Sequence, residues 1–220
     1  MKNKITLMFV VGLLTISLMT FVMAAPTGGS VAEGATSSWS GTASTSVNTY
    51  GGNITEVNVS GYSQTGRWAG FWGEVSGGIR LSDGTNSFYE WTVTDVTGAV
   101  VYAADAAVSN WGSIAAAGIS DLPGYLTAGA TDNFTNTFNT TGKTFTSASL
   151  SISNVPYTNT YSGGSAGNLE TYALKDGTTL IWAGKALSNE ASFDGGTVDY
   201  QLLVPANTTQ QTYNFYLELP

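Results

Sequence analysis

The fold is best predicted by residues 169–183, Leu169-Glu-Thr-Tyr-Ala-Leu-Lys-Asp-Gly-Thr-Thr-Leu-Ile-Trp-Ala183. An Asp-Gly pair between two apolar, β-forming runs is the strongest short-range signal for a β-hairpin. A two-residue turn at Asp176-Gly177 fixes the register of the two strands. It pairs Leu174 with Thr179 and Tyr172 with Ile181 on one face, and Ala173 with Leu180 and Thr171 with Trp182 on the other.

Short strands with period-two alternation continue on both sides of this hairpin. Toward the C-terminus, two such runs flank a loop at 205–212. Their members are Val198, Tyr200, Leu202 and Val204, then Tyr213, Phe215, Leu217 and Leu219. Upstream, the expected strands are a first one marked by Ile54, Val57 and Val59, then 67–75, 79–81, 89–93, 100–102 and 145–152.

The facing of the strands at 79–81 and 89–93 depends on the length of the loop between them. Ile79 and Leu81 share a face with Tyr89 and Trp91 only if an odd number of residues forms the loop around 83–86. An even loop would oppose them to Phe88 and Glu90. We therefore predict an odd loop.

About ten short strands with turns every 8 to 12 residues predict an all-β fold, an antiparallel β-sandwich or jelly roll. We expect one domain over residues 51–220, with no C-terminal membrane span or sorting tail. One short helix is expected over 111–117, because Asn110 can cap its start and Gly118 can end it. The Thr- and Asn-rich stretch 121–143 is expected to be loose.

The N-terminal region has the layout of a secretory signal peptide over residues 1–24. Lys2 and Lys4 precede the apolar run Ile5–Met23, and Ala24 offers a cleavage site. An uncleaved anchor helix is the alternative, since 19 apolar residues can nearly span a bilayer. Residues 25–50 form a Ser/Thr/Gly-rich arm. It is either a flexible, solvated leader or a strand that pairs with a neighbouring molecule.

Composition excludes several function classes. Without Lys2 and Lys4, five basic residues stand against 15 acidic ones, a net charge of −10, which disfavours nucleic acid and anionic lipid as partners. The chain contains neither Cys nor His, so the usual zinc, copper, haem and iron–sulfur sites and the Ser-His-Asp and Cys-His nucleophiles are excluded. Charged residues make up only 10%, which suits a surface covered by glycan or by a neighbouring copy.

Five Asn-X-Ser/Thr motifs match the acceptor pattern for N-glycosylation. In order of preference, these glycosylation candidates are Asn207, Asn133, Asn139, Asn53 and Asn58. Asn207 comes first because it lies at the tip of a predicted hairpin.

Seven aromatic residues can be read in two ways. They are Trp68, Phe71, Trp72, Tyr89, Trp91, Trp111 and Trp182. Rings at alternating strand positions are typical of a core between sheets, and Tyr89 and Trp91 are in phase with aliphatic residues. A flat platform that stacks on sugars is the alternative. Trp68 and Trp72 are its best candidates because they share a strand face.

Acidic residues allow two weaker hypotheses. Glu74 and Glu90 flank tryptophans and are candidates for the acid and base of a glycosidase, although neither lies in a recognisable catalytic motif. The loop residues Asp83, Asn86, Asp95, Asp105 and Asp194 offer oxygen ligands for calcium, the cofactor that the missing residue types do not exclude. Their spacing matches no known calcium loop, so we assign no metal-ligating residue and no catalytic residue.

Three blocks of the chain resemble a recurrent pattern in uncharacterised exported surface proteins of archaea. They are Trp68-Ala-Gly-Phe-Trp-Gly-Glu-Val-Ser-Gly77 with Phe88-Tyr-Glu-Trp91, Gly98-Ala-Val-Val-Tyr-Ala103, and Phe193-Asp-Gly-Gly-Thr-Val-Asp-Tyr200 with Tyr213-Asn-Phe-Tyr-Leu-Glu218. The resemblance implies a secreted or surface β-domain and carries no activity.

We expect a non-catalytic extracellular structural or adhesive protein, in its most specific form the subunit of a cell-surface filament or layer. Its expected partners are copies of itself or cell-surface polymers, and it touches a membrane only through an uncleaved N-terminal segment. Only three lysines follow residue 24, whereas sheet edges are usually guarded against pairing by charge. The alternatives are a glycan-binding module and, last, a glycoside hydrolase.

Overall fold

The computed structural model describes residues 25–39, 41, 43–127, 129–139, 142–207 and 209–220. The expected signal peptide and its cleavage site lie outside the described residues. The fold is mostly β, with 39% strand and 7% helix, and every strand pair is antiparallel. The predicted all-β fold class is therefore confirmed.

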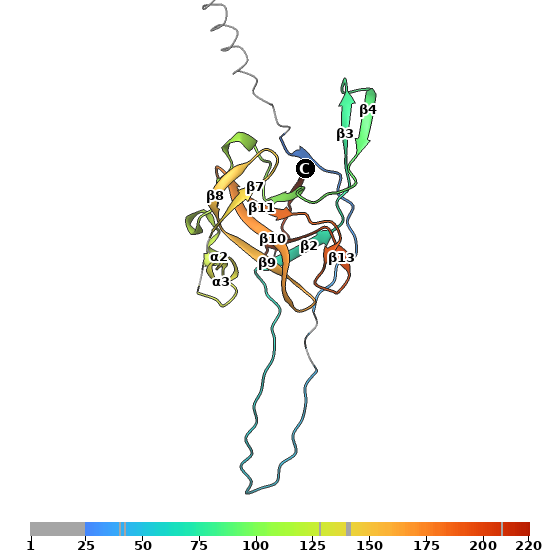
Figure 1. The fold of residues 1–220 in the computed structure, drawn as a ribbon. Coiled ribbons are helices and arrows are strands. Elements are labelled where there is room, and N and C mark those ends of the chain that lie inside the picture. The colour runs from blue at the N-terminus through green and yellow to red at the C-terminus, as the bar shows by residue number, and fades with distance from the viewer. Residues whose placement is uncertain (1–24, 40, 42, 128, 140–141, 208) are drawn as a thin grey trace, which may run out of the picture.

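A seven-stranded sheet forms the centre of the molecule (Figure 1). Its order is β1 (Thr27–Gly28), β15 (Asn214–Glu218), β5 (Val100–Ala104), β11 (Thr179–Lys185), β10 (Ser165–Asp176) and β6 (Ala115–Ala116), with β9 (Tyr157–Ser162) also paired to β10. The chain's first and last strands are thus neighbours at one edge.

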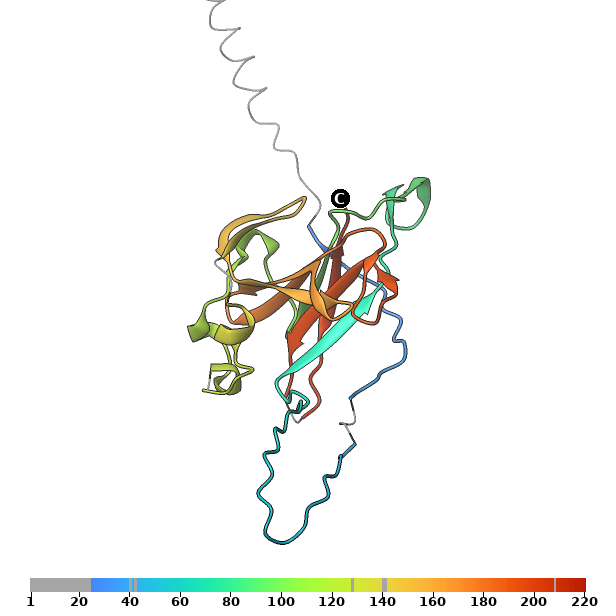
Figure 2. The same ribbon diagram turned by 60° about the horizontal axis from the view of Figure 1, so that its bottom comes forward.

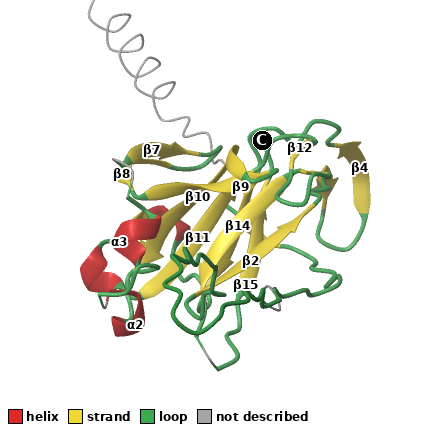
Figure 3. Ribbon diagram, turned by 90° about the horizontal axis from the view of Figure 1, so that it is seen from below, coloured by secondary structure: helices red, strands yellow, loops and turns green. Residues whose placement is uncertain are grey.

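Four two-stranded sheets and two short helices surround this sheet. The pairs are β2 (Trp68–Gly73) with β14 (Tyr200–Pro205), β3 (Gly78–Ser82) with β4 (Ser87–Thr92), β7 (Lys143–Thr146) with β8 (Ser151–Val155), and β12 (Glu190–Ala191) with β13 (Thr197–Val198). The helices α2 (Gly124–Thr127) and α3 (Phe134–Thr137) lie together at one end of the sheets (Figure 3).

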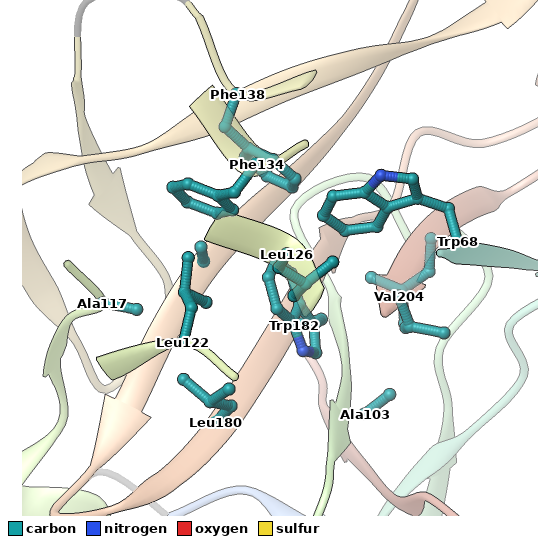
Figure 4. Close-up of a cluster of buried hydrophobic side chains, with 12 residues drawn as sticks. Trp68, Ala103, Ala117, Leu122, Leu126, Phe134, Phe138, Leu180, Trp182 and Val204 are labelled. Atoms are coloured by element: carbon teal, nitrogen blue, oxygen red, sulfur yellow. The ribbon is translucent and has the colours of Figure 1, made fainter. Parts of the chain in front are cut away.

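Both faces of the central sheet are covered, because its strands alternate apolar residues to both sides. On one face, Ala173, Leu180 and Trp182 pack against Leu202 and Val204 of β14 and against the α2–α3 region. Figure 4 shows Trp182 within this cluster, near the rings of Phe134, Phe138 and Trp68. On the other face, the second cluster joins the sheet to β7 and β8. Its buried members are Val100, Tyr102, Ala104, Phe145, Val155, Tyr172, Leu174, Ile181 and Ala183.

The hairpin at 169–183 exists, but its predicted register is wrong by two residues. Leu174 pairs with Ile181 and Tyr172 with Ala183, so the turn is Gly177-Thr178 and not Asp176-Gly177. Gly177 has φ +59°, the positive value that a hairpin turn of this length requires at its first central position. Because the shift is an even number, the predicted faces survive.

Asp176 explains the shift, since its carboxylate is held in the sheet by a neighbouring segment. Its Oδ2 accepts hydrogen bonds from the Ser109 backbone N–H (2.7 Å), the Ser109 hydroxyl (2.7 Å) and the Asn110 N–H (3.0 Å). Its Oδ1 accepts one from the Ser113 hydroxyl (3.0 Å). These donors, with the Ser109 hydroxyl first, lower the pKa of Asp176 to about 2.

Replacing Asp176 by asparagine is expected to lower stability at neutral pH and to flatten its acid dependence. A folded-state pKa below the unfolded value of 3.8 stabilises the fold above about pH 4, and this contribution is lost as pH falls toward about 2. Urea unfolding at several pH values measures both effects. Glu33→Gln, at an exposed carboxyl, is the control. Equal acid slopes in Asp176→Asn and the parent protein would contradict this role.

Two predicted elements are corrected by tertiary pairing. The helix expected over 111–117 is only a 3-10 turn at Trp111–Ser113, which Asn110 caps by accepting from the Gly112 N–H. Ala115 and Ala116 then pair with Lys175 and Leu174 of β10, because an open sheet edge outweighs the helix propensity of alanine. The expectation of a single helix is also wrong, since the stretch 121–143 contains α2 and α3.

Two predicted strands are corrected as well. Residues 145–152 are not one strand, because a turn closed by the Ser147 N–H and the Leu150 carbonyl separates β7 from β8. Ile54, Val57 and Val59 form no strand at all. The segment that contains them extends away from the body.

Candidate functional site

A long loop, residues 29–66, projects from the body as two extended limbs (Figures 1 and 2). We call it the projecting loop. Every described residue in it is exposed. Loops of this length without secondary structure are uncommon in compact domains and are usually functional or disordered. Its large apolar side chains are Val31, Trp39, Val47, Tyr50, Ile54, Val57, Val59 and Tyr62.

The projecting loop is anchored only at its two ends. At the start, the Gly29 N–H donates to the Phe215 carbonyl of β15. At the end, the Thr65 hydroxyl donates to Asp132 (2.7 Å), and Arg67 forms an ion pair with the same carboxylate (2.9 Å). Between 30 and 64, the backbone–backbone hydrogen bonds of the described residues comprise one local turn, from the Asn53 N–H to the Tyr50 carbonyl. The limbs therefore offer unpaired backbone groups.

The β3–β4 hairpin projects from another side of the body, away from the projecting loop (Figures 1 and 2). All residues of both strands are exposed. Ile79 pairs with Trp91 and Leu81 with Tyr89, which confirms the predicted shared face. We call these four side chains the hairpin face. The rings of Tyr89 and Trp91 contact each other at 4.8 Å between centroids.

The prediction of an odd loop is wrong for the tip itself, although the predicted facing holds. Ser82 pairs with Ser87, so the tip itself has the four residues Asp83–Asn86, an even number. A register shift next to Leu81 leaves Phe88 without a partner, and this extra residue restores the predicted facing. Asp83 shapes the tip by accepting from the backbone N–H groups of Asn86 and Thr85, which lower its pKa.

The base of the hairpin is held tightly although its strands are exposed. The Val93 N–H donates to the Gly77 carbonyl (3.1 Å), and Val75 and Val93 pack with Val96 and Leu217. A Cβ at Gly78 would lie 2.8 Å from the carbonyl oxygen of Trp91. Only glycine allows this close approach of the two strands at the base of the hairpin.

The aromatic residues divide between core and surface. Trp68, Phe71, Trp111 and Trp182 join the core clusters, as the core interpretation predicts. Trp72, Tyr89 and Trp91 are exposed, so for these three that interpretation is wrong. For Tyr89 and Trp91, the alternation in phase with aliphatic residues correctly marked one face of a hairpin. No residue pattern indicated that this face lacks a cover.

The prediction that Trp68 and Trp72 form a sugar platform together is wrong, because Trp68 is buried. Trp68 is 8% exposed and donates its Nε1–H to the Asp132 carbonyl (2.7 Å). Trp72 is 49% exposed and packs edge-on against Phe193. Trp68 therefore has no free ring face to share with Trp72.

Glu74 and Glu90 have different partners. Loss of solvent, and next the charge of Asp199, raise the pKa of Glu74. Glu90 lies on the hairpin in an exposed ion pair with Arg80 (2.7 Å). Neither glutamate lines the cavity around Asp105 and Tyr213 or the cavity around Trp111 and Leu150.

Most of the five calcium candidates accept hydrogen bonds from residues near them in the sequence. The carboxylates of Asp83 and Asp95 accept from backbone N–H groups two or three residues on, and Asp194 accepts from the Ser192 hydroxyl and the Gly196 N–H. These hydrogen bonds lower the pKa values of the three carboxyl groups. Asp105 differs, because burial raises its pKa. Within the described ranges, no three acidic residues converge as a metal site would require.

The glycosylation candidates have unequal surroundings. Asn53 and Asn58 lie in the projecting loop, and Asn139 is also exposed. Asn133 is partly buried and caps α3 by accepting from the Asn136 N–H. Asn207, the preferred candidate, is partly buried, and its Oδ1 accepts from both the backbone N–H and the hydroxyl of Thr209. Occupancy of these sites stays a prediction.

Comparison with known proteins found no matching family model, no matching curated protein and no matching solved structure. The archaeal surface proteins therefore remain a resemblance. Among the described residues, no helix has the length and apolar character needed to cross a membrane.

Proposed function

We propose that this protein is an extracellular structural subunit that associates with copies of itself, the projecting loop of one copy lying on the hairpin face of the next. Two observations carry the proposal: an apolar sheet face is left uncovered on one side of the molecule, and a segment rich in β-branched residues is left unpaired on another side (Figure 2). The secretory layout of residues 1–24 and the low charged content support a place outside the cell.

The hairpin face favours burial in a second copy. An isolated two-stranded sheet is only marginally stable in water. Ile79, Leu81, Tyr89 and Trp91 are each about half exposed. Covering them releases roughly 3–6 kcal/mol, taking half of the usual burial energy for each large apolar side chain.

The projecting loop supplies a suitable occupant. Residues 53–60 (Asn-Ile-Thr-Glu-Val-Asn-Val-Ser) are rich in β-branched residues and free of proline, which favours an added strand. The loop contains Glu33 and Glu56 but no lysine or arginine before Arg67, so Arg80 on the hairpin meets no like charge.

The positions of the two segments predict the type of assembly. Because they point away from each other, one copy can use both at once (Figure 2). A contact between two different surfaces is heterologous and closes into rings or continues as a filament. A structural or adhesive protein of the cell surface requires this kind of repetition.

Self-association is expected to increase with ionic strength, because a net charge of −10 on each exported copy opposes contact at low salt. Sedimentation velocity of the purified protein between about 0.05 and 0.5 M NaCl, with negative-stain microscopy of the same samples, measures this. A second series of the same samples contains added calcium. Particles that keep the monomer mass at high protein concentration, at every salt concentration and with or without calcium, would refute the proposal.

A further inference from the structure

A cavity of about 470 Å³ opens near the end of β5, distant in sequence from the projecting loop and from the hairpin face. Four parts of the chain build its wall: the residue after β5, the start of β11, the segment around α2, and the loop that follows β14. The lining residues with polar or aromatic groups that matter here are Asp105, Tyr125, Trp182, Gln211 and Tyr213. Small-molecule sites usually measure roughly 300–1,000 Å³.

Trp182 contributes a buried donor without a partner. The residue is 1% exposed, and among the described residues no acceptor lies within hydrogen-bonding distance of its Nε1–H. Figure 4 shows the nitrogen on the side of the indole that faces away from Phe134 and Phe138, toward Leu180 and Ala103. Leu180 lines the same cavity. Buried N–H groups in folded proteins are nearly always paired, so this one indicates a missing acceptor.

Asp105 contributes an acceptor to the same cavity. Its Oδ1 accepts from the Leu180 N–H (2.9 Å), and no side chain of the described residues donates to the carboxylate. Tyr125 and Tyr213 line the same cavity as Asp105, and burial is the main cause that raises the pKa of each phenol. The cavity thus brings together the Trp182 indole, the Asp105 carboxylate and two tyrosine rings.

This combination selects among ligand chemistries. An anion is disfavoured by Asp105 and finds no free cation, because the nearby Lys175 is paired with Asp121 (2.7 Å). A simple amine can pair with Asp105 but cannot accept from the Trp182 N–H. A sugar hydroxyl both donates and accepts, and the C–H face of a sugar ring packs on aromatic side chains.

We propose that this cavity binds a neutral saccharide residue, with Trp182 donating to a sugar oxygen, Asp105 accepting from a sugar hydroxyl, and Tyr125 and Tyr213 packing on the ring. The saccharide can belong to a surface polysaccharide or to an N-linked glycan on a neighbouring copy. The site is independent of the proposed self-association, and neither tryptophan of the earlier platform hypothesis lines it.

The test follows the indole N–H resonances of the ¹⁵N-labelled protein during titration with neutral trisaccharides of glucose, mannose and galactose, up to about 50 mM. The Trp182 resonance, assigned by its loss in Trp182→Phe, is expected to shift saturably. Asp105→Asn keeps the acceptor for the Leu180 N–H and is expected to weaken binding about tenfold, since an amide accepts more weakly than a carboxylate. Trp72→Phe, at an exposed ring outside the cavity, is expected to leave affinity unchanged.

Titration with released N-glycans and with neutral polysaccharide fragments identifies the source, and either ligand supports the site. Trp182→Phe is expected to abolish the hydrogen-bonded contact. Wild-type affinity in both Trp182→Phe and Asp105→Asn would overturn the proposal. So would an unchanged Trp182 resonance with all saccharides, or tighter binding of glucuronate or of an alkyl amine.

Discussion

The Leu81→Asp protein is expected to remain a monomer at concentrations where the parent protein assembles. Leu81 lies on the hairpin face, opposite Tyr89, and covering this face with a second copy would bury the new carboxylate without a partner. A weakening of self-association by a factor of about 100 or more, equivalent to about 3 kcal/mol, is expected. Sedimentation velocity at the salt concentration where the parent assembles measures it.

Thr92→Asp is the matched control for Leu81→Asp. It adds the same charge to an exposed position of the same hairpin, but in register with Gly78, on the side opposite the hairpin face. Both variants should unfold at the parent's temperature, because neither side chain is buried in a single copy. If both assemble like the parent protein, the hairpin face is not the contact. If both lose assembly equally, added charge alone is the cause.

Phe145→Ala is expected to lower the free energy of unfolding by about 3–5 kcal/mol, which is the usual cost of removing a buried phenylalanine ring. Phe145 is 0% exposed and contacts the ring of Tyr172 at 5.1 Å between centroids. It also joins β7 to the central sheet, so its loss leaves a cavity between two layers. Urea unfolding followed by tryptophan fluorescence gives the value.

Phe88→Ala provides the matched control, since it makes the same chemical change at a residue that is 85% exposed. Its effect on unfolding should stay within about 0.5 kcal/mol. A loss below about 1 kcal/mol for Phe145→Ala would mean that β7 and β8 are only loosely attached. The described packing of the second cluster would then be wrong.

Local patterning predicted the fold class well, because strands and tight turns are encoded by neighbouring residues. The facing of Ile79 and Leu81 with Tyr89 and Trp91 followed from period-two alternation alone. The register of the 169–183 hairpin did not, because the Ser109–Ser113 segment, more than 60 residues away in sequence, holds Asp176 in the ladder. The same limit applies to Ala115 and Ala116, where a distant strand edge decides the conformation.

The candidate sites were harder to predict, because exposure is a property of the assembled fold. Ile54, Val57 and Val59 look like strand residues and lack only a partner strand within the chain. Trp68 and Trp72 share a strand face, yet only Trp72 reaches solvent. The cavity around Asp105 and Trp182 joins segments separated by more than 70 residues, and no local pattern indicates such a meeting.

The adjacency of β1 and β15 has a consequence for how the protein reaches its native state. β15 lies between β1 and β5, so the central sheet is incomplete until residues near 218 are available. Contacts between distant segments also slow folding, because the entropy of closing a long loop is lost before the contacts can stabilise the chain. In the export that we propose, a chain passing through a translocation channel would lack one strand of its central sheet until β15 has crossed. Under that proposal, the delay would keep the chain unfolded while it passes through the channel.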